Sequence, residues 1–233
     1  MTASLKSKVF PNIATNYKSH KWLCERTILA PRNNAVDKLN LNLLSQFPGP
    51  ECSYRSIDSV PDQEQAMHYP VEFLNSLCPL GFSPNILIMK TDALIMLLRN
   101  LDALRLCNGP RLVVKTAMPH VSEATIITGN MMSKNVFIPR VSPISNDLPL
   151  HFKRLQFPVK LSFAMFINKV QGQSLKVVGL NLLQPCFSRG HLDNEDAVAV
   201  ISSISSAGFA SLKMCGIRDP LVEKQIHSIQ AGH

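Results

Sequence analysis

The sequence has no closely spaced cysteines or histidines. Its six cysteines, at positions 24, 52, 78, 107, 186 and 215, form no CxxC pair, and its seven histidines are scattered along the chain. A structural zinc site needs such ligands at short spacing, and a small disulfide framework needs cysteines that are denser than this. The sequence therefore argues against both, and we expect no metal site.

The chain also lacks the short motifs of several enzyme classes. None of its ten glycines is followed by lysine, so the GxxxxGK[ST] loop that cradles the phosphates of ATP is absent from these 233 residues. GxGxxG, GxSxG and HExxH are absent as well. By themselves, these residues show no catalytic constellation.

Long apolar runs are missing too. The longest uncharged apolar stretch, residues 197–212, contains five serines and is shorter than the roughly 20 apolar residues that span a bilayer. The N-terminus lacks the apolar core, about 7–15 residues long, of a secretory signal. We expect no membrane segment, no secretion, and a reducing compartment such as the cytosol or nucleus.

Positive charge is abundant. The 24 lysines and arginines outnumber the 16 acidic residues and give a net charge of +8, which favours an anionic partner such as nucleic acid or an acidic membrane surface. Residues 148–192 contain no acidic residue, and their cations suit a phosphate backbone: Lys153, Arg154, Lys160, Lys169, Lys176 and Arg189. The alternative is a basic face without a ligand.

Residues 51–84, which carry Asp58 and other carboxylates, are interpreted as a solvated, irregular connection with one short helix near residues 71–77.

The spacing of apolar residues predicts an α/β fold. Residues 27–30 suit a buried strand, and the following apolar residues up to Phe47 have helical spacing. An asparagine in the turn between them is expected to cap the helix. Loops of this kind lie at the carboxyl ends of strands, where ligands usually bind, so Arg32 and Asn33 are candidates for ligand contact; a plain connecting loop is the alternative.

The pattern of residues 86–141 predicts a small antiparallel sheet or barrel. After it, the pattern predicts strands at residues 159–165 and 177–182, with a helical turn at 171–175 between them.

One segment resembles a known motif. Residues 164–175, AMFINKVQGQSL, share ten of twelve residues with AMTINKSQGQSL, the usual form of the fifth motif of superfamily-one DNA helicases of the PIF (petite integration frequency) family, including those of Helitron transposons. Further stretches are similar to this family in the same order: residues 25–40, 69–77 and 96–112. The resemblance runs from about residue 9 to residue 192.

The resemblance implies a RecA-like parallel sheet flanked by helices, with an inserted small antiparallel β-barrel. We expect residues 1–24 to link to a missing first motor domain, residues 25–85 and 157–205 to form the second RecA-like domain, residues 86–156 to form the barrel, and residues 206–233 to be a divergent tail. The chain would then be the C-terminal motor half of an ATP-dependent 5′–3′ DNA helicase. The family points to the nucleus, or the mitochondrion.

The resemblance also implies site residues and partners. Contacts to single-stranded DNA are expected from Arg32, Asn33, Arg99, Asn100, Asn108, Asn168 and Lys169. The ATP cleft is expected to be faced by Gln171, Gly172 and Gln173. ATP and Mg²⁺ serve the complete family enzyme, and neither is expected to bind tightly to this chain alone. The first, Walker-loop-bearing helicase domain is an expected partner, in cis or in trans.

Departures from the family pattern bear on activity. Phe166 stands where the fifth motif has threonine, and Val170 where it has serine. The arginine of the sixth motif, which reaches the γ-phosphate, has no counterpart, because no arginine occurs between Arg189 and Arg218. We expect little or no ATP hydrolysis by this chain alone. The alternatives are a non-enzymatic single-stranded-DNA-binding module or a decayed remnant of a Helitron helicase.

Overall fold

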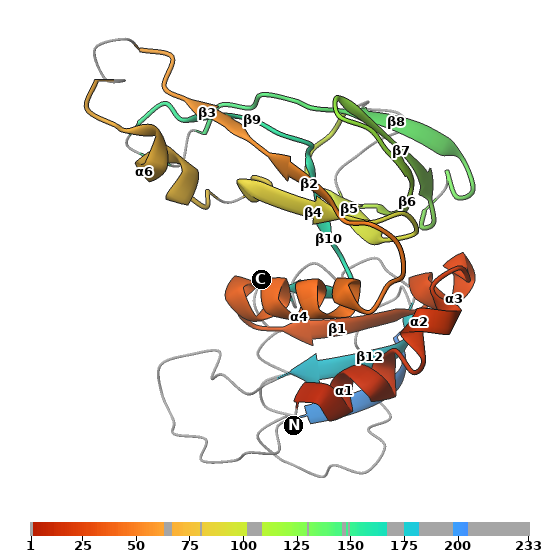
Figure 1. Ribbon diagram of the computed structural model, residues 1–233. Helices are drawn as coiled ribbons and strands as arrows, with labels where there is room; N and C mark the ends of the chain where they lie inside the picture. Colours follow the sequence, from red (N-terminus) through yellow and green to blue (C-terminus); the bar gives the residue numbers. More distant parts are fainter. Residues whose placement is uncertain are drawn as a thin grey trace, which may run out of the picture. The chain divides into compact units, whose positions relative to one another are not determined.

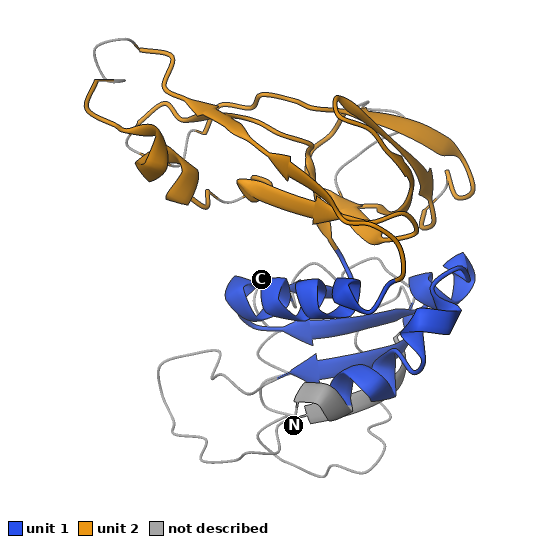
Figure 2. Ribbon diagram, viewed as in Figure 1, with its two compact units in different colours: residues 1–47, 162–233 blue, residues 48–161 orange. Residues whose placement is uncertain are grey.

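The computed structural model describes residues 2–62, 67–79, 81–101, 109–129, 131–145, 148, 150–166, 175–181 and 198–204. The chain divides into two compact units (Figure 2). The first unit comprises residues 1–47 and 162–233, and the second unit comprises residues 48–161. Each unit is described separately.

The first unit contains a four-stranded sheet in the order β11-β1-β12-β13, of which β1 and β12 are labelled in Figure 1. Strand β1 (Arg26–Ala30) is parallel to β11 (Ala164–Phe166) on one side and to β12 (Leu175–Asn181) on the other. Strand β13 (Val198–Ile204) runs antiparallel to β12. The apolar residues of β1 are fully buried, which confirms the strand expected at residues 27–30.

The described residues of the first unit form the helices α1 (Thr2–Val9), α2 (Ile13–Asn16), α3 (His20–Cys24) and α4 (Asn33–Ser45). Helix α4 follows β1 directly and buries an apolar face against β1 and β11, as the helical spacing predicted. Helix α1 packs on β12, where a Cβ added to Gly179 would lie only 2.6 Å from Val9 Cγ2 and 2.8 Å from Leu5 Cδ1. Residues 2–24, expected to be a linker, are therefore part of the packed first unit.

The second unit contains a five-stranded antiparallel sheet in the order β10-β5-β6-β7-β8. Its strands are β5 (Leu94–Leu97), β6 (Arg111–Ala117), β7 (Val121–Ile126), β8 (Asn135–Pro139) and β10 (Val159–Leu161). A bulge interrupts the β6–β7 pairing between Val114 and Thr116. Gly129, in the turn between β7 and β8, has a φ of 83°, a conformation that glycine adopts at little cost.

Among the described residues, two small antiparallel pairs and the helix α6 (Val71–Ser76) complete the second unit. Strand β2 (Cys52–Arg55) pairs with β4 (Ile86–Met89), and β3 (Ile57–Ser59) pairs with β9 (Lys153–Leu155). Helix α6 (Val71–Ser76) is the short helix expected near residues 71–77. It adds Leu74 to a cluster of buried residues with Val60, Leu150 and Phe152.

The unit boundaries differ from those expected from the sequence. The sequence predicts domain boundaries at 85/86 and 156/157, whereas the chain passes from one compact unit to the other at 47/48 and 161/162. Strands β2 and β3 explain the first difference, because they lie in the segment interpreted as an irregular connection and pair with β4 and β9. The strand expected over residues 159–165 is in fact two strands, β10 and β11, which belong to different sheets.

Candidate nucleic-acid interface

The carboxyl end of β1 leads directly into α4. Arg32 occupies the N-cap position with an extended backbone, at φ −130° and ψ 139°, and makes no side-chain cap hydrogen bond. Its carbonyl oxygen accepts the N–H groups of Ala35 and Val36 at 3.1 Å. The expected asparagine cap is therefore wrong, since Asn33 is already the first helical residue. Arg32 and Asn33 are both exposed, at a helix end whose N–H groups favour an anion.

Strand β11 ends at the same edge of the sheet. In the parallel pairing of the two strands, Ala30 lies opposite Phe166, so the last residues of β1 and β11 are neighbours. The chain therefore leaves β1 and β11 at neighbouring points on the carboxyl edge of the sheet. Six expected site residues lie outside the described part of the chain: Asn108, Asn168, Lys169, Gln171, Gly172 and Gln173.

A buried amide joins α4 to β11. Asn40, which is 2% exposed, donates from Nδ2 to the carbonyl oxygen of Ala164 at 3.0 Å and accepts the N–H of Ala164 on Oδ1 at 2.8 Å. Sequence reasoning did not select Asn40 as a functional residue. Its signal was a polar side chain on the apolar face of α4, four positions after Val36 and four before Leu44.

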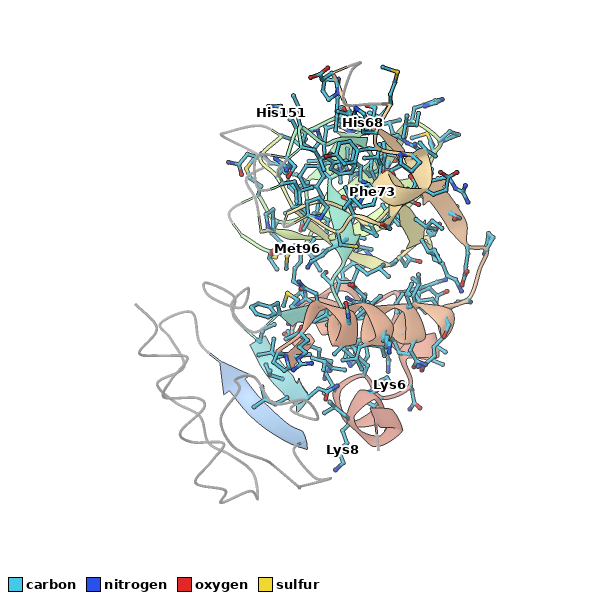
Figure 3. The ribbon with its side chains drawn as sticks, turned by 90° about the vertical axis from the view of Figure 1, so that its left-hand side faces the viewer. Lys6, Lys8, His68, Phe73, Met96 and His151 are labelled. Carbon is cyan, nitrogen blue, oxygen red and sulfur yellow. The ribbon has the colours of Figure 1, made fainter. Side chains whose placement is uncertain are left out.

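Two lysines in the last turn of α1 have different surroundings (Figure 3). Lys6 lies close to α4 and donates a hydrogen bond to Asn42 Oδ1. Lys8 extends away from the helix and is exposed. Lys8 is therefore a solvated cation of the first unit that lies on a different element from Arg32.

Arg99 and Asn100 belong to the second unit, just after β5. The guanidinium of Arg99 lies 4.7 Å from the ring centroid of Phe82, within the range of a cation–π contact. Arg99 also lines a small pocket, together with Phe82, Arg154 and Gln156. Asn100 is exposed. These two candidates lie in the second unit, whereas Arg32 and Asn33 lie in the first.

Two cations of the basic segment 148–192 are not free to bind phosphates. Arg154 is 1% exposed and forms a two-point salt bridge with Asp58, from Nε to Oδ1 at 2.9 Å and from Nη2 to Oδ2 at 2.6 Å. Asp58, interpreted as part of a solvated acidic face, is itself buried. Lys176 lies 2.6 Å from Glu25 Oε1. The uniformly basic face expected from the sequence is therefore partly neutralised.

Electrostatic shifts around β1 have identifiable causes. The hydrogen bond from Lys176 lowers the pKa of Glu25, outweighing the opposing effect of burial. Burial lowers the pKa of Arg26, whose guanidinium lies 4.5 Å from the ring centroid of Trp22. In the second unit, burial raises the pKa of Tyr54 to about 12. None of these groups lies among the expected site residues, so the shifts do not indicate acid–base chemistry there.

Other kinds of site find no support in the described residues. They contain no group of three or more histidine, cysteine, aspartate or glutamate side chains arranged to hold a metal ion. Within the same residues, no helix is long and apolar enough to cross a membrane.

The chain is similar to known proteins along most of its length. A family model described as "DNA helicase Pif1, 2B domain" matches residues 72–116. An ATP-dependent DNA helicase PIF1 from Xenopus laevis is 30% identical over 169 residues, which cover 72% of this chain and 25% of that protein. The PIF1 helicase of Danio rerio is 29% identical over 171 residues, covering 67% of this chain and 23% of that protein. The chain thus spans about a quarter of the length of these relatives.

A solved structure extends the similarity to the fold. The crystal structure of Pif1 helicase from Candida albicans superposes with a TM-score of 0.51 and 18% identity, covering 73% of this chain and 47% of that one. At this identity, the superposition establishes a shared fold over the covered part.

Proposed function

This chain corresponds to the C-terminal part of the PIF1-family DNA helicases, and we propose that it is the motor half that binds single-stranded DNA and one side of the ATP cleft. The first unit would be the second RecA-like domain, and the five-stranded sheet of the second unit would be the inserted small barrel. The family-model match supports this assignment, because residues 72–116 include β4, β5 and most of β6.

One observation carries the proposal. The parallel pairing of β1 and β11 places Ala30 opposite Phe166, so the loop with Arg32 and the fifth-motif segment start from the same edge of the sheet. In open α/β sheets, the carboxyl edge of parallel strands is where ligands bind. Arg32 supplies a cation there, and the first turn of α4 supplies N–H groups without a side-chain cap.

DNA would be held chiefly through its phosphates. Cations and amides hold a phosphate backbone without reading the sequence of the bases. Arg32, Asn33, Asn168 and Lys169 would form this contact in the first unit. Arg99, Asn100 and Asn108 would form a further contact in the second unit, where Arg99 already stacks on an aromatic ring.

The nucleotide would be shared with another domain. Gln171, Gly172 and Gln173 would face ATP and Mg²⁺ in the complete enzyme. These 233 residues contain neither the GxxxxGK[ST] loop nor the sixth-motif arginine. A first motor domain, in cis or in trans, would supply the loop, and this chain alone would hydrolyse little or no ATP.

Binding of a fluorescent oligothymidine to the purified chain, followed by anisotropy, tests the DNA contact. Arg32→Ala is expected to weaken binding about tenfold, the effect of losing about 1.4 kcal/mol from one charge-assisted contact. Lys8→Ala removes the same charge from α1 and is expected to change affinity less than about twofold. Equal affinities for wild type and Arg32→Ala would overturn the assignment of this edge to DNA.

A further inference from the structure

Asn40 is a polar residue on the buried face of a helix. Val36, Leu39, Leu43 and Leu44 form the rest of this face on α4 and are all buried. Burying a primary amide without partners is costly, so such a side chain persists where its oxygen and its nitrogen each have a hydrogen-bond partner. Asn40 meets this condition by bonding both backbone groups of a single residue, Ala164.

The amide of Asn40 occupies the place that a neighbouring strand would have beside β11. Within the described sheet, β11 is an edge strand with β1 on one side only. The N–H and carbonyl groups of Ala164 point away from β1, and the amide of Asn40 pairs with both of them. On the other side, the carbonyl of Phe163 accepts the Ile28 N–H at 3.0 Å and the Thr27 hydroxyl at 3.1 Å. The three-residue strand β11 is therefore fixed from both sides.

We propose that Asn40 is a positioning residue: by bonding both backbone groups of Ala164, the first residue of β11, it holds this three-residue strand at a fixed place relative to α4. This inference rests on the proposed DNA-binding function. Helix α4 carries Arg32 in the turn before its first residue and Asn40 two turns later, so one rigid helix joins the candidate DNA contact to β11. Arg32 would then bind one DNA strand effectively only when β11 is held in place.

The Asn40 amide suits this position because it carries both a donor for the Ala164 carbonyl and an acceptor for the Ala164 N–H. Leucine has the same branching at Cγ, with two larger methyl groups, but leaves both backbone groups of Ala164 without a partner. Ionised aspartate accepts the Ala164 N–H but presents a second negative oxygen to the Ala164 carbonyl. Protonated aspartate restores the full pattern, because its hydroxyl donates and its carbonyl oxygen accepts.

The variant Asn40→Asp therefore carries an internal control. Burial and the facing carbonyl would raise the pKa of this carboxyl above its ordinary value of about 3.9, so the neutral, functional form would return as pH falls. Strand β11 brings no titratable side chain to this contact, β1 brings Arg26, and α4 itself brings the exposed Asp37 and Lys38. These groups are common to wild type and variant, so wild-type binding at each pH serves as the reference.

The test measures how strongly binding depends on Arg32 in each background. In wild type, Arg32→Ala is expected to weaken oligothymidine binding about tenfold. In Asn40→Asp at about pH 8, affinity is expected to be at least about fivefold weaker, and adding Arg32→Ala to cost less than about threefold more, because the two residues are coupled. At about pH 5, both effects are expected to return toward the wild-type values.

Each result decides between defined alternatives. A purely structural role would lower the folded fraction and leave the effect of Arg32→Ala in folded protein unchanged, which would overturn the inference. Asn40→Leu, checked for folding by the fluorescence of the single tryptophan, Trp22, is expected to stay weak at both pH values, and wild-type affinity in this variant would also overturn it. Absence of oligothymidine binding by the wild-type chain would overturn the proposed function and this inference together, whereas the two preceding results overturn the inference alone.

Discussion

Arg154 and Asp58 form a completely satisfied salt bridge inside the second unit. Besides its two bonds to the carboxylate, Arg154 donates from Nη1 to the carbonyl oxygens of Leu77 and Ser83 at 3.1 Å and from Nη2 to that of Leu74 at 3.2 Å. All five N–H groups of the guanidinium are thus used. One side chain joins β9 to β3 and to the carboxyl end of α6, so its role in this unit is structural.

Breaking this pair is expected to destabilise the second unit strongly. Asp58→Ala leaves a buried, uncompensated guanidinium, which is expected to lower the free energy of unfolding by about 3–5 kcal/mol. Urea unfolding followed by circular dichroism measures the change. Lys115→Ala is the matched control, because it breaks the Lys115–Glu123 pair, whose lysine is 52% exposed, and is expected to cost less than about 1 kcal/mol. Similar losses in the two variants would contradict the structural role of the buried pair.

The same pair shows where charge patterns are insufficient. The sequence indicated an acidic, solvated segment around Asp58 and a basic face around Arg154, which lie 96 positions apart. Counting charges along the chain cannot detect that two opposite charges neutralise each other across a sheet. The missed strands β2 and β3 have the same cause, since their partners β4 and β9 are distant in sequence.

Local pattern was sufficient elsewhere. The buried strand β1, the amphipathic helix α4 and the presence of antiparallel strands within residues 86–141 were predicted from the local sequence pattern. For the candidate site, the sequence predicted Arg32 and Asn33 at a strand end, and the parallel pairing of β1 with β11 confirms that this loop lies at the carboxyl edge of the sheet. It did not predict Asn40, because its partner Ala164 is identified only by tertiary pairing.

Gly179 is expected to tolerate no larger side chain while α1 is in place. An alanine Cβ would lie 2.6 Å from Val9 Cγ2 and 2.8 Å from Leu5 Cδ1, so α1 has to shift. Gly179→Ala is expected to destabilise the first unit by about 1–3 kcal/mol, measured by urea unfolding with Trp22 fluorescence. Adding Val9→Ala removes the nearer clashing methyl group, Val9 Cγ2, and leaves only Leu5 Cδ1 to shift, so the two changes are expected to cost less together than their sum. Simple additivity would show that α1 does not pack here.

The Glu25–Lys176 pair predicts a dependence of stability on pH. The pKa of Glu25 is lowered in the folded state, so its contribution is present above the unfolded value of about 4.3 and is lost as pH falls through the folded pKa. Because Lys176 is 64% exposed, the contribution is expected to stay below about 1 kcal/mol. Glu25→Gln is expected to be less stable than wild type at neutral pH, and the difference is expected to shrink as pH falls below the unfolded pKa of about 4.3. A difference that persists unchanged in acid would contradict the role of this ion pair.

ATP hydrolysis by the isolated chain is expected to be negligible. Neither the GxxxxGK[ST] loop nor the sixth-motif arginine occurs in these residues, and an arginine of this kind is worth about 10³–10⁵ in rate in other nucleotide hydrolases. Phosphate release with and without oligothymidine measures this directly. Turnover that DNA stimulates and that co-purifies with the chain through several columns would contradict the expectation.

The most direct test of the central claim is the salt dependence of oligothymidine binding to the intact chain. Binding that engages about four phosphates is expected to give a slope of about −3 in a plot of log K against log salt concentration, because each neutralised phosphate releases condensed counterions. Arg32→Ala is expected to reduce the magnitude of this slope by about 0.7, and Lys8→Ala is expected to leave it unchanged. An affinity that does not change with salt concentration would contradict the proposal that this chain binds single-stranded DNA through its phosphates.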